Sequence, residues 1–409
     1  MRPGVQVAAA LACLFGLAVV VQSTGAETID LAVYRAGGQL ALDGGALYDG
    51  PVFRGDMLFT YTPFAALLFT PLAMLTPAAA TVAVALLNAA LLVWCALRCW
   101  QATPLRVGRG QRLLLAGGTA GVLLATEAVH ATLFLGQVNL LLMALVLWDL
   151  LGRESRRTVG IGIGIAAGIK LTPFLLVGYL LVTRRLRAAV TSVVAFAGTV
   201  LVGLVLLPGP SVTFWLGGTF ADPTRVYADV TSTHNQSLRG LLLRSGLSQP
   251  VAQLLWMAAA AAVVAVTFLL AARAYRAGER VLAVALCGMC GATVSPWTWG
   301  HHWVWLVPLA VFLGGVLLRP RWARRDLVWL APTALLPLTF PWVLALADPP
   351  DASGAPPVLD AGPAALVVGN LYVLVFLTTL AATAWHLRAR AEVVPVAPGR
   401  AEGPVPVAV

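Results

Sequence analysis

Charged residues are scarce in this sequence, and lysine is almost missing from it. Of the 409 residues only 11% are charged, against about 25% in an average soluble domain, and Lys170 is the one lysine. No polar stretch is long enough to fold as a separate soluble domain. The sequence therefore has too few charged residues to cover the surface of a water-soluble protein, and an ordinary soluble fold is excluded.

Cysteine is also rare. The five cysteines are Cys13, Cys95, Cys99, Cys287 and Cys290, and all of them fall within apolar segments. A disulfide framework is therefore not expected. The Cys287-x-x-Cys290 pair has no second pair of ligands near it in the sequence, so it is interpreted as two small buried residues rather than a metal site.

Apolar residues fill most of the chain. They make up 59% of it, which is enough for about twelve membrane crossings of ~20 residues each. Transmembrane barrels are excluded because they show short alternating segments rather than long apolar runs. We expect an all-α, polytopic transmembrane bundle forming one domain over residues 1–390, with a disordered tail at 391–409. The candidate spans are 5–21, 57–75, 78–99, 113–126, 131–151, 159–182, 188–207, 251–272, 281–294, 303–318, 327–346 and 363–385.

The net charge of +10 comes almost wholly from arginine. The arginines lie in short clusters between apolar runs, which indicates membrane topology and no nucleic-acid partner. With both termini in the cytoplasm, three acidic loops, 22–56, 208–250 and 347–362, face outward. The clusters are at 106–112, 153–157, 184–187, 273–280 and 319–325.

The number of crossings stays open at this point. Twelve full crossings place the clusters at 106–112 and 153–157 outside, against the positive-inside tendency. Ten crossings place them inside if 57–75 and 159–182 are re-entrant segments. The first apolar run is followed by a sequence similar to a signal-peptidase site at 24–26. We expect this first helix to remain uncleaved.

Polar residues near the outer ends of the spans carry the functional hypotheses, because burying them in a membrane needs a reason. Asp30 follows the first apolar run and lies close in sequence to Tyr34, Tyr48 and Tyr61. A carboxylate at the membrane interface can stay ionised while partly desolvated, which suits a general base. The alternative is an ordinary acidic loop residue or helix cap.

A tryptophan-rich segment at 295–305 contains the adjacent pair His301 and His302. Tryptophans alone would indicate an interfacial belt. The histidines can donate hydrogen bonds to a phosphate. A shared metal ion is disfavoured, because adjacent helical residues point about 100° apart. A structural role at the interface is the remaining alternative.

Two further groups of polar residues complete the candidate set. In the segment 234–240, Asn235 and Gln236 can read sugar hydroxyls and Arg239 can pair with a phosphate, or the segment is a polar loop cap. Within the apolar runs, Gln137, Asn139 and Lys170 are exceptional. Lys170 either anchors a phosphate or marks a helix break. The glycines at 160, 162, 164 and 168 predict close helix packing rather than a dinucleotide loop.

Taken together, the motifs from about residue 30 to residue 305 resemble glycosyltransferase family 87, which includes polyprenyl-phosphate-mannose-dependent α-mannosyltransferases. The resemblance implies a GT-C type transmembrane architecture in a bacterial plasma membrane, an extracytoplasmic active site and a lipid-phosphate sugar donor. It implies no cofactor and no metal. The family's catalytic aspartate corresponds to Asp30, and its histidine to His301 or His302. The motifs are D-x-x-x-Y at 30–34, G-A-L-Y at 45–48, F-T-Y-T-P at 59–63, F-T-P-L at 69–72, G-Q-V-N at 136–139, G-I-K-L-T-P at 168–173 with the arginine pair at 184–185, and N-Q-S at 235–237.

The expected reaction is transfer of a mannosyl residue from a polyprenyl-phosphate donor to a cell-envelope glycolipid or lipoglycan, with inversion at the anomeric carbon. In this hypothesis Asp30 is the base. Membrane lipids are the surrounding partners. Two alternatives stay open: an arabinofuranosyltransferase that uses polyprenyl-phosphate arabinose, and a lipid or sugar transporter. The residues assigned to the donor phosphate are Lys170, Arg239, His301 and His302, and those assigned to sugars are Tyr34, Tyr48, Tyr61, Gln137, Asn139, Asn235 and Gln236.

Overall fold

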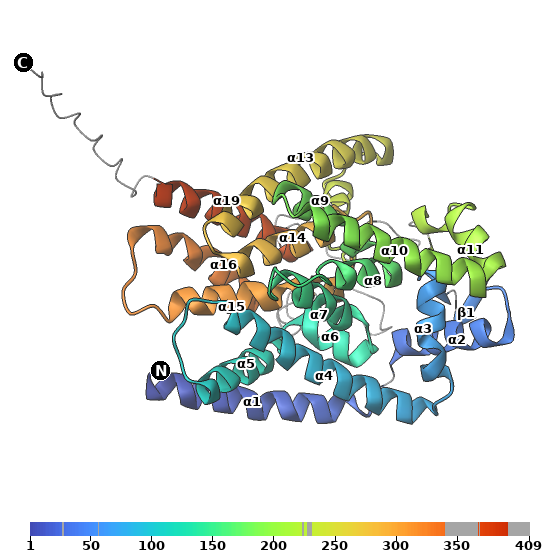
Figure 1. Ribbon diagram of the computed structural model, residues 1–409, viewed down its shortest axis with the longest axis horizontal. Coiled ribbons are helices and arrows are strands. Elements are labelled where there is room, and N and C mark those ends of the chain that lie inside the picture. Colours follow the sequence, from blue (N-terminus) through green and yellow to red (C-terminus); the bar gives the residue numbers. More distant parts are fainter. Residues whose placement is uncertain are drawn as a thin grey trace, which may run out of the picture.

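The computed structural model describes residues 1–26, 28–55, 57–222, 225–226, 231–339, 367 and 369–391, and nearly all of them are helical or in short connections. Figure 1 shows the helices packed into one elongated bundle. The only strands in the described part form a small antiparallel hairpin of β1 (Pro51–Phe53) and β2 (Met57–Leu58). The expected all-α polytopic bundle is confirmed. Of the predicted tail at 391–409, Ala391 is the last residue of α19, and the rest lies outside the described residues, as does the loop at 347–362.

The helices follow the apolar runs of the sequence, with short 3₁₀ segments at several breaks. Their bounds are α1 Pro3–Ser23, α2 Ile29–Asp43, α3 Pro63–Ala73, α4 Pro77–Gln101, α5 Arg109–Leu123, α6 Glu127–Leu135, α7 Asn139–Leu150, α8 Ile161–Ile169, η1 Thr172–Leu175, α9 Leu176–Val182, α10 Leu186–Leu206, α11 Pro208–Trp215, η2 Thr219–Ala221, α12 Leu238–Arg244, α13 Gln249–Arg276, α14 Arg280–Val294, η4 Gly300–Trp305, α15 Leu306–Leu317, η5 Arg324–Trp329, α16 Leu330–Leu335, η6 Leu336–Thr339 and α19 Leu371–Ala391.

Fewer helices are long enough to cross a membrane unaided than the ten to twelve expected. Among the described residues, 6 helices qualify by length and composition, or 7 if α5 and α6, which are bent by 84°, count as one span. Several predicted runs are interrupted instead. The run 131–151 breaks at Gly136, whose φ of 73° is a left-handed conformation that suits glycine. The run 159–182 breaks at Lys170.

The segment 159–182 enters the bundle and returns to the same end. α8 has 9 residues and α9 has 7, so neither is longer than about 14 Å at ~1.5 Å per residue. Lys170 ends α8 in an extended conformation, and the chain turns back through η1. α3, with 11 residues, is also too short to cross. Both predicted re-entrant candidates thus fail to form a full span.

All five arginine clusters consequently meet at one end of the bundle. Residues from three clusters, Arg106, Arg280 and Arg319, line one cavity. Arg280 also lies 3.5 Å from Glu154 of the 153–157 cluster. In addition, the guanidinium of Arg185 lies 5.9 Å from the Tyr275 ring. This arrangement removes the conflict with the positive-inside tendency that twelve full crossings create.

The segment 22–56, predicted to be an acidic loop, contains a helix. α2 (Ile29–Asp43) buries Leu31, Val33 and Tyr34, and it ends at Gly44 in a left-handed conformation. It packs against α3, and Figure 1 shows both at the opposite end of the bundle from the N-terminus. Its mixed polar and apolar faces hid it from a search for continuous apolar runs.

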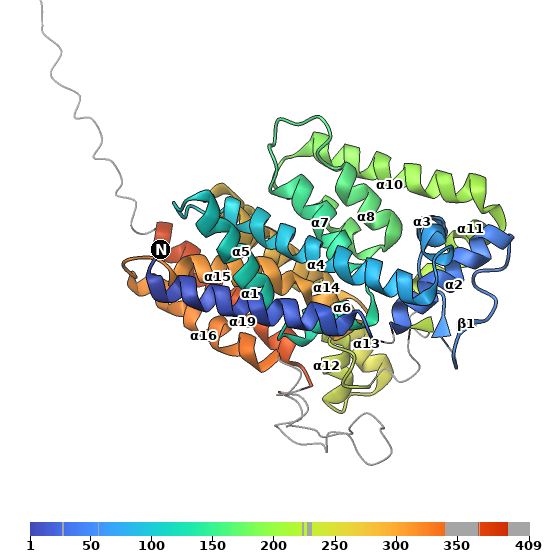
Figure 2. The ribbon, with the colours of Figure 1, turned by 90° about the horizontal axis from the view of Figure 1, so that it is seen from below.

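Glycines let the central helices approach closely. A Cβ at Gly121 of α5 would lie 1.8 Å from the carbonyl oxygen of Ala12 in α1. In α8, Cβ atoms at Gly162 and Gly164 would lie 2.4 Å from the Leu145 oxygen and 2.5 Å from the Ser192 oxygen, respectively. α8 therefore packs closely against both α7 and α10, which lie beside it in Figure 2. The predicted packing role of the α8 glycines is confirmed.

We expect Gly121→Leu to lower the thermal unfolding temperature of the detergent-purified protein. The added side chain meets the backbone of α1, and such overpacking costs about 1–3 kcal/mol. Gly110→Leu is the matched control, because a Cβ at Gly110 of the same helix meets nothing within 4 Å. Equal unfolding temperatures for the two variants would contradict the close α1–α5 contact.

Candidate active site

Asp30 stands in the first turn of α2, where the helix N-terminus favours a negative charge. The side-chain amide of Gln137 lies near its carboxylate and lowers its pKa. Oε1 of the same amide accepts hydrogen bonds from the Tyr34 and Tyr61 hydroxyls, at 2.8 and 3.2 Å. The two tyrosine oxygens are 2.8 Å apart. Because an amide has one donor end and one acceptor end, the tyrosines hold the nitrogen of Gln137 toward Asp30.

The helix break at Gly136 is what brings Gln137 to this position. The chain turns there between α6 and α7, and the Gln137 side chain becomes buried, with 3% exposure. Its backbone carbonyl accepts a hydrogen bond from Nδ2 of Asn88 in α4 at 3.0 Å. Asn88 is itself a buried polar residue within an apolar run. The break is therefore tied to its neighbouring helix, and the amide beside Asp30 is held rigidly.

The ionisation of Asp30 reflects these surroundings. Burial raises the pKa of the Asp30 carboxyl above its ordinary value, while the Gln137 amide and the positive charge of Lys170 lower it. Burial is the largest of the three effects, so the pKa is raised overall. A carboxylate with a raised pKa is a stronger base, and Asp30 keeps part of its surface exposed. Asp30 can therefore take a proton from a bound group.

Lys170 lies at the tip of the α8–α9 hairpin. Its Nζ is 2.8 Å from Nε2 of His302 and 5.4 Å from the centre of the Tyr61 ring. Two positive charges at 2.8 Å would repel strongly. We therefore assign the Lys170 ammonium as the donor and a neutral His302 as the acceptor, with the imidazole proton on Nδ1. The hydroxyl of Thr62, next to Tyr61, donates to the Gly168 carbonyl and holds the hairpin tip in place.

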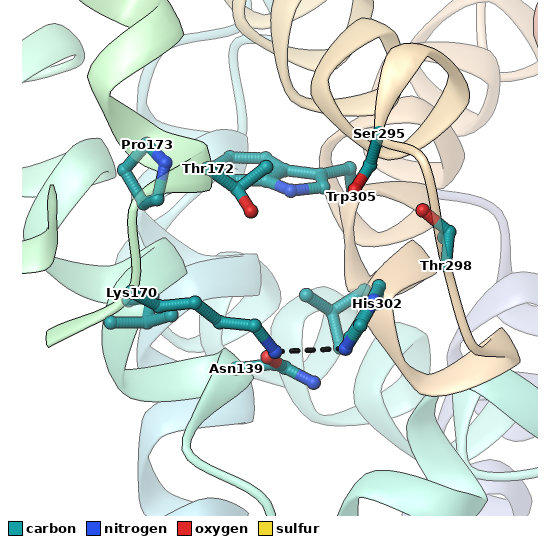
Figure 3. Close-up of a pocket in the computed structure, with 10 residues that line it drawn as sticks. Asn139, Lys170, Thr172, Pro173, Ser295, Thr298, His302 and Trp305 are labelled. Atoms are coloured by element: carbon teal, nitrogen blue, oxygen red, sulfur yellow. Dashed lines mark hydrogen bonds between the residues drawn. The ribbon is translucent and has the colours of Figure 1, made fainter. Parts of the chain in front are cut away.

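A small cavity of about 40 Å³ opens beside Lys170 and His302. Figure 3 shows the side chains of Lys170, His302, Asn139, Thr172, Ser295 and Thr298 around it. It lies where α7 begins, α8 and α14 end, and η1 begins, so ends of several helices converge on it. A cation, an imidazole, an amide and hydroxyls are the groups that bind a phosphate. The cavity can therefore accept an anionic group.

The two histidines have different environments in the structure, whereas the sequence offers no reason to choose between them. His302 lines the cavity. His301 is 6% exposed, and its ring lies 6.2 Å from the Trp299 ring in a stacked arrangement. The His301 backbone carbonyl accepts hydrogen bonds from Asn139 at 2.8 Å and from Thr132 at 3.4 Å. His302 thus faces the site, and His301 helps to hold the helix ends together.

The tyrosines and Asn139 are mostly enclosed. Tyr34, Tyr48 and Tyr61 are at most 8% exposed, and Tyr48 donates its hydroxyl to the Tyr61 carbonyl at 2.8 Å. These three residues form a scaffold around Gln137 and Lys170. Asn139 lines the cavity while its amide nitrogen binds the His301 carbonyl. Direct contact of these side chains with a sugar stays a prediction.

The segment 234–240 is not part of this cluster. Oδ1 of Asn235 accepts hydrogen bonds from the Ser237 hydroxyl at 2.8 Å and from the Thr298 backbone at 3.3 Å. Nε2 of Gln236 donates to the Thr233 and Gly369 carbonyls. The Asn235 amide thus holds the chain that carries Thr298, and the Gln236 amide holds the chain that leads into α19.

Arg239 is also separate, since it does not line the cavity beside Lys170. Its neighbour Arg244 binds the backbone of Ser232 at 2.7 Å and of Asn235 at 3.0 Å instead. The roles predicted for Asn235, Gln236 and Arg239 stay predictions.

Three hydroxyl residues of the cavity were not predicted from the sequence: Thr172, Ser295 and Thr298. A hydroxyl residue beside a proline or a tryptophan carries no distinct signal in the sequence. The Ser295 hydroxyl donates to the Trp297 carbonyl at 2.9 Å and the Thr298 hydroxyl to the Ala292 carbonyl at 2.6 Å. Thr172 makes no such hydrogen bond within the described chain, so its hydroxyl can donate into the cavity.

No metal centre can be assigned from the described ranges, since no three histidine, cysteine or acidic side chains gather there. The described cysteines are free, and Cys287 and Cys290 are buried in α14. Their interpretation as small packing residues is confirmed.

A partly exposed carboxylate next to a cation-bearing cavity, at one end of a polytopic helical bundle, is the arrangement of a membrane-embedded transferase. The carboxylate can remove a proton, and the cavity can hold an anionic leaving group.

Comparison with known proteins identifies the class. Residues 59–296 match glycosyltransferase family 87. The chain is 35% identical, over 314 residues, to the polyprenol-phosphate-mannose-dependent alpha-(1-2)-phosphatidylinositol mannoside mannosyltransferase of Mycobacterium tuberculosis. The matched region covers 73% of this chain and 72% of that protein. It is also 34% identical, over 349 residues, to a polyprenol-phosphate-mannose-dependent alpha-(1-2)-phosphatidylinositol pentamannoside mannosyltransferase of the same species, with 80% and 75% coverage.

The Mycolicibacterium smegmatis protein with the first of these names is 35% identical over 318 residues, covering 72% of this chain and 71% of its own length. The chain belongs to glycosyltransferase family 87. It is a membrane glycosyltransferase, and the resemblance drawn from the motifs is confirmed.

We expect Gln137→Leu to shift the acid limb of the pH profile of sugar transfer to higher pH. Asp30 acts as a base when deprotonated, and loss of the Gln137 amide, which favours the charged form, raises its pKa further. Transfer at a fixed, mildly acidic pH should therefore fall. The control is Gln39→Leu, on the exposed side of α2. A fall in rate with an unchanged pH profile would contradict this positioning role.

Proposed function

We propose that this enzyme transfers a mannosyl residue from a polyprenyl-phosphate donor to a phosphatidylinositol mannoside, with inversion at the anomeric carbon. The observation that carries the proposal is the position of Asp30 beside Lys170 and His302. One part of the site can take a proton, and the adjacent part can bind a phosphate. Both are needed in the same place when a sugar leaves a lipid phosphate.

The proposed reaction is a single displacement. Asp30 removes the proton from a hydroxyl of the acceptor sugar, and the hydroxyl oxygen forms a bond to the anomeric carbon of the donor. The bond between that carbon and the phosphate oxygen breaks, and its electron pair stays on the phosphate. The proton ends on Asp30. Attack from the face opposite the phosphate converts a β-linked donor into an α-linked product.

The cavity supplies the complementary charge. Negative charge builds up on the departing phosphate, so fixed cations and donors that are aimed at it lower the barrier. Lys170 has three donor hydrogens, of which one is used by His302. The remaining hydrogens, together with the Thr172 hydroxyl, can bind phosphate oxygens. His302 keeps the ammonium in place, so it acts as a positioning residue in this proposal.

The donor and acceptor assignments are supported by the relatives. Their names specify polyprenol-phosphate mannose as the donor and phosphatidylinositol mannosides as acceptors. The chain is covered over most of its length in these comparisons, and the family match over residues 59–296 includes the hairpin that carries Lys170. Polyprenyl-phosphate arabinose is the alternative donor, because the phosphate-binding groups are indifferent to the sugar.

The proposed orientation places the Asp30 site on the extracytoplasmic side of a bacterial plasma membrane. The arginine clusters gather at the opposite end of the bundle, and the positive-inside tendency assigns such an end to the cytoplasm. Asp30, the acidic end of the α2 helix and the hairpin β1–β2 then face outward. Labelling of single cysteines introduced at residues 43 and 155 from outside intact cells tests this orientation. Only the first should react.

We expect Asp30→Asn to lower the rate of transfer by about 10²–10⁴-fold, the usual contribution of a positioned base. The amide keeps the shape of the side chain but cannot accept the proton. Purified protein, assayed with radiolabelled polyprenyl-phosphate mannose and a phosphatidylinositol mannoside, provides the measurement. Asp43→Asn, at the other end of α2, should leave the rate unchanged. More than a tenth of wild-type activity in Asp30→Asn would refute the assignment.

We expect Lys170→Met to weaken donor binding by about 10- to 100-fold, since hydrogen bonds to charged groups contribute about 1.5–3 kcal/mol. The acceptor KM should change little. His302→Ala should affect the donor KM more than His301→Phe, because His302 touches Lys170. Equal and small effects of the two histidine changes would show that the pair is only interfacial.

The same assay separates the competing functions. Polyprenyl-phosphate arabinose, offered in place of the mannose donor, should give no product with the wild-type enzyme. Product formation from arabinose alone would favour the arabinofuranosyltransferase. Movement of a lipid-linked sugar across a vesicle membrane without any covalent product would favour a transporter.

A further inference from the structure

A second and larger cavity lies at the end of the bundle opposite the Asp30 site. Its volume is about 350 Å³. The connection after α4, the turn between α13 and α14, and the C-terminal part of α15 form its walls. α15 follows the segment that carries His302 and reaches this cavity at Phe312, its seventh residue, after a rise of about 9 Å from Leu306. The two cavities share no lining residue. The cavity is therefore separate from the site of sugar transfer.

The lining combines an apolar wall with basic groups. Phe312 and Val316 of α15 supply apolar surface, and Gly315 leaves open space between them. Arg106, Arg280 and Arg319 belong to the same lining, and so does the acidic Glu279. Outside the lining, Arg280 lies 3.5 Å from Glu154 and Arg319 lies 2.8 Å from Asp326. Basic side chains outnumber acidic ones in this lining, and three of the arginine clusters meet there.

The three arginines differ in how they are held. Arg280 donates to the Leu150 carbonyl at 2.6 Å and to the Gly152 carbonyl at 3.0 Å. Arg319 pairs with Asp326 at 2.8 Å. Arg106 is exposed and forms no hydrogen bond or ion pair with any residue that the structure describes. Two guanidiniums are thus fixed in position, and the third is available to a ligand.

We propose that this cavity binds the head group of an anionic phospholipid, with the adjoining part of an acyl chain against α15. A phosphate suits the guanidinium groups, which pair with it through two parallel hydrogen bonds. An acyl chain suits the Phe312 and Val316 wall. Basic pockets between transmembrane helices are a recurring form of lipid-binding site. A small soluble anion would leave the apolar wall unused, so the lipid fits the lining better.

Photolabelling of the full-length protein in phosphatidylcholine nanodiscs tests this proposal. The probes are phosphatidylglycerol and phosphatidylcholine that carry the same photoreactive acyl chain, and mass spectrometry locates the modified residues. We expect the phosphatidylglycerol probe to label residues 102–106 and 312–320, and the phosphatidylcholine probe to label them several-fold less.

Two variants separate specific binding from general membrane contact. Gly315→Leu fills the cavity without a clash, because a Cβ at this position meets only Thr103, at 3.9 Å. It should abolish the phosphatidylglycerol label at 102–106. Its control is Gly198→Leu, at an exposed helical position of α10 where a Cβ meets nothing within 4 Å. That variant should keep the label.

Arg106→Gln should reduce phosphatidylglycerol labelling about fivefold, since one basic side chain near a membrane surface contributes about 1 kcal/mol to binding of an anionic lipid. Arg109→Gln removes the same charge from the start of α5, outside the cavity, and should leave the label unchanged. Equal labelling by the two probes, or labelling that Gly315→Leu leaves intact, would overturn the proposal.

Discussion

The burial of charged groups close to one another, Asp30 on α2 and Lys170 at the tip of the α8–α9 hairpin, is the constraint on which the rest of the site depends. An ionised group that is withdrawn from water is costly unless opposite charge or hydrogen bonds compensate it. Lys170 lowers the pKa of Asp30, and Gln137 does so as well. Each charge thus offsets part of the cost of burying the other. α2 and the α8–α9 hairpin must both be placed correctly for this, so much of the fold serves to hold two short segments together.

Breaks in the helices place the side chains of the site. Gly136 turns the chain between α6 and α7 so that Gln137 points to Asp30, and Lys170 stands where α8 ends. Backbone groups freed at such breaks need other partners inside a membrane. Thr62 binds the Gly168 carbonyl, and Asn139 binds the His301 carbonyl. Polar residues that look misplaced in an apolar sequence thus complete the breaks, and the same breaks create the cavity.

The two ends of the bundle carry different chemistry. The Asp30 end holds a partly exposed carboxylate and a small cation-bearing cavity, whereas the arginine end holds a larger amphipathic cavity. α15 and its preceding segment connect the two. An enzyme that acts on lipids must keep a defined depth in the bilayer, and anionic lipids held at the arginine end would help to set it.

The sequence by itself determined the helical membrane bundle and the family, because long apolar runs must form helices in lipid and isolated polar residues within them are rare. It identified Asp30, Lys170 and Gln137, since each is a polar residue without a local reason. It missed α2, whose polar face resembles a loop, and it left His301 and His302 equivalent. Only the tertiary structure decided between the histidines, joined the arginine clusters at one end and excluded Arg239 from the cavity. Those facts depend on where distant helices end, and helix ends are set by packing between segments far apart in the chain.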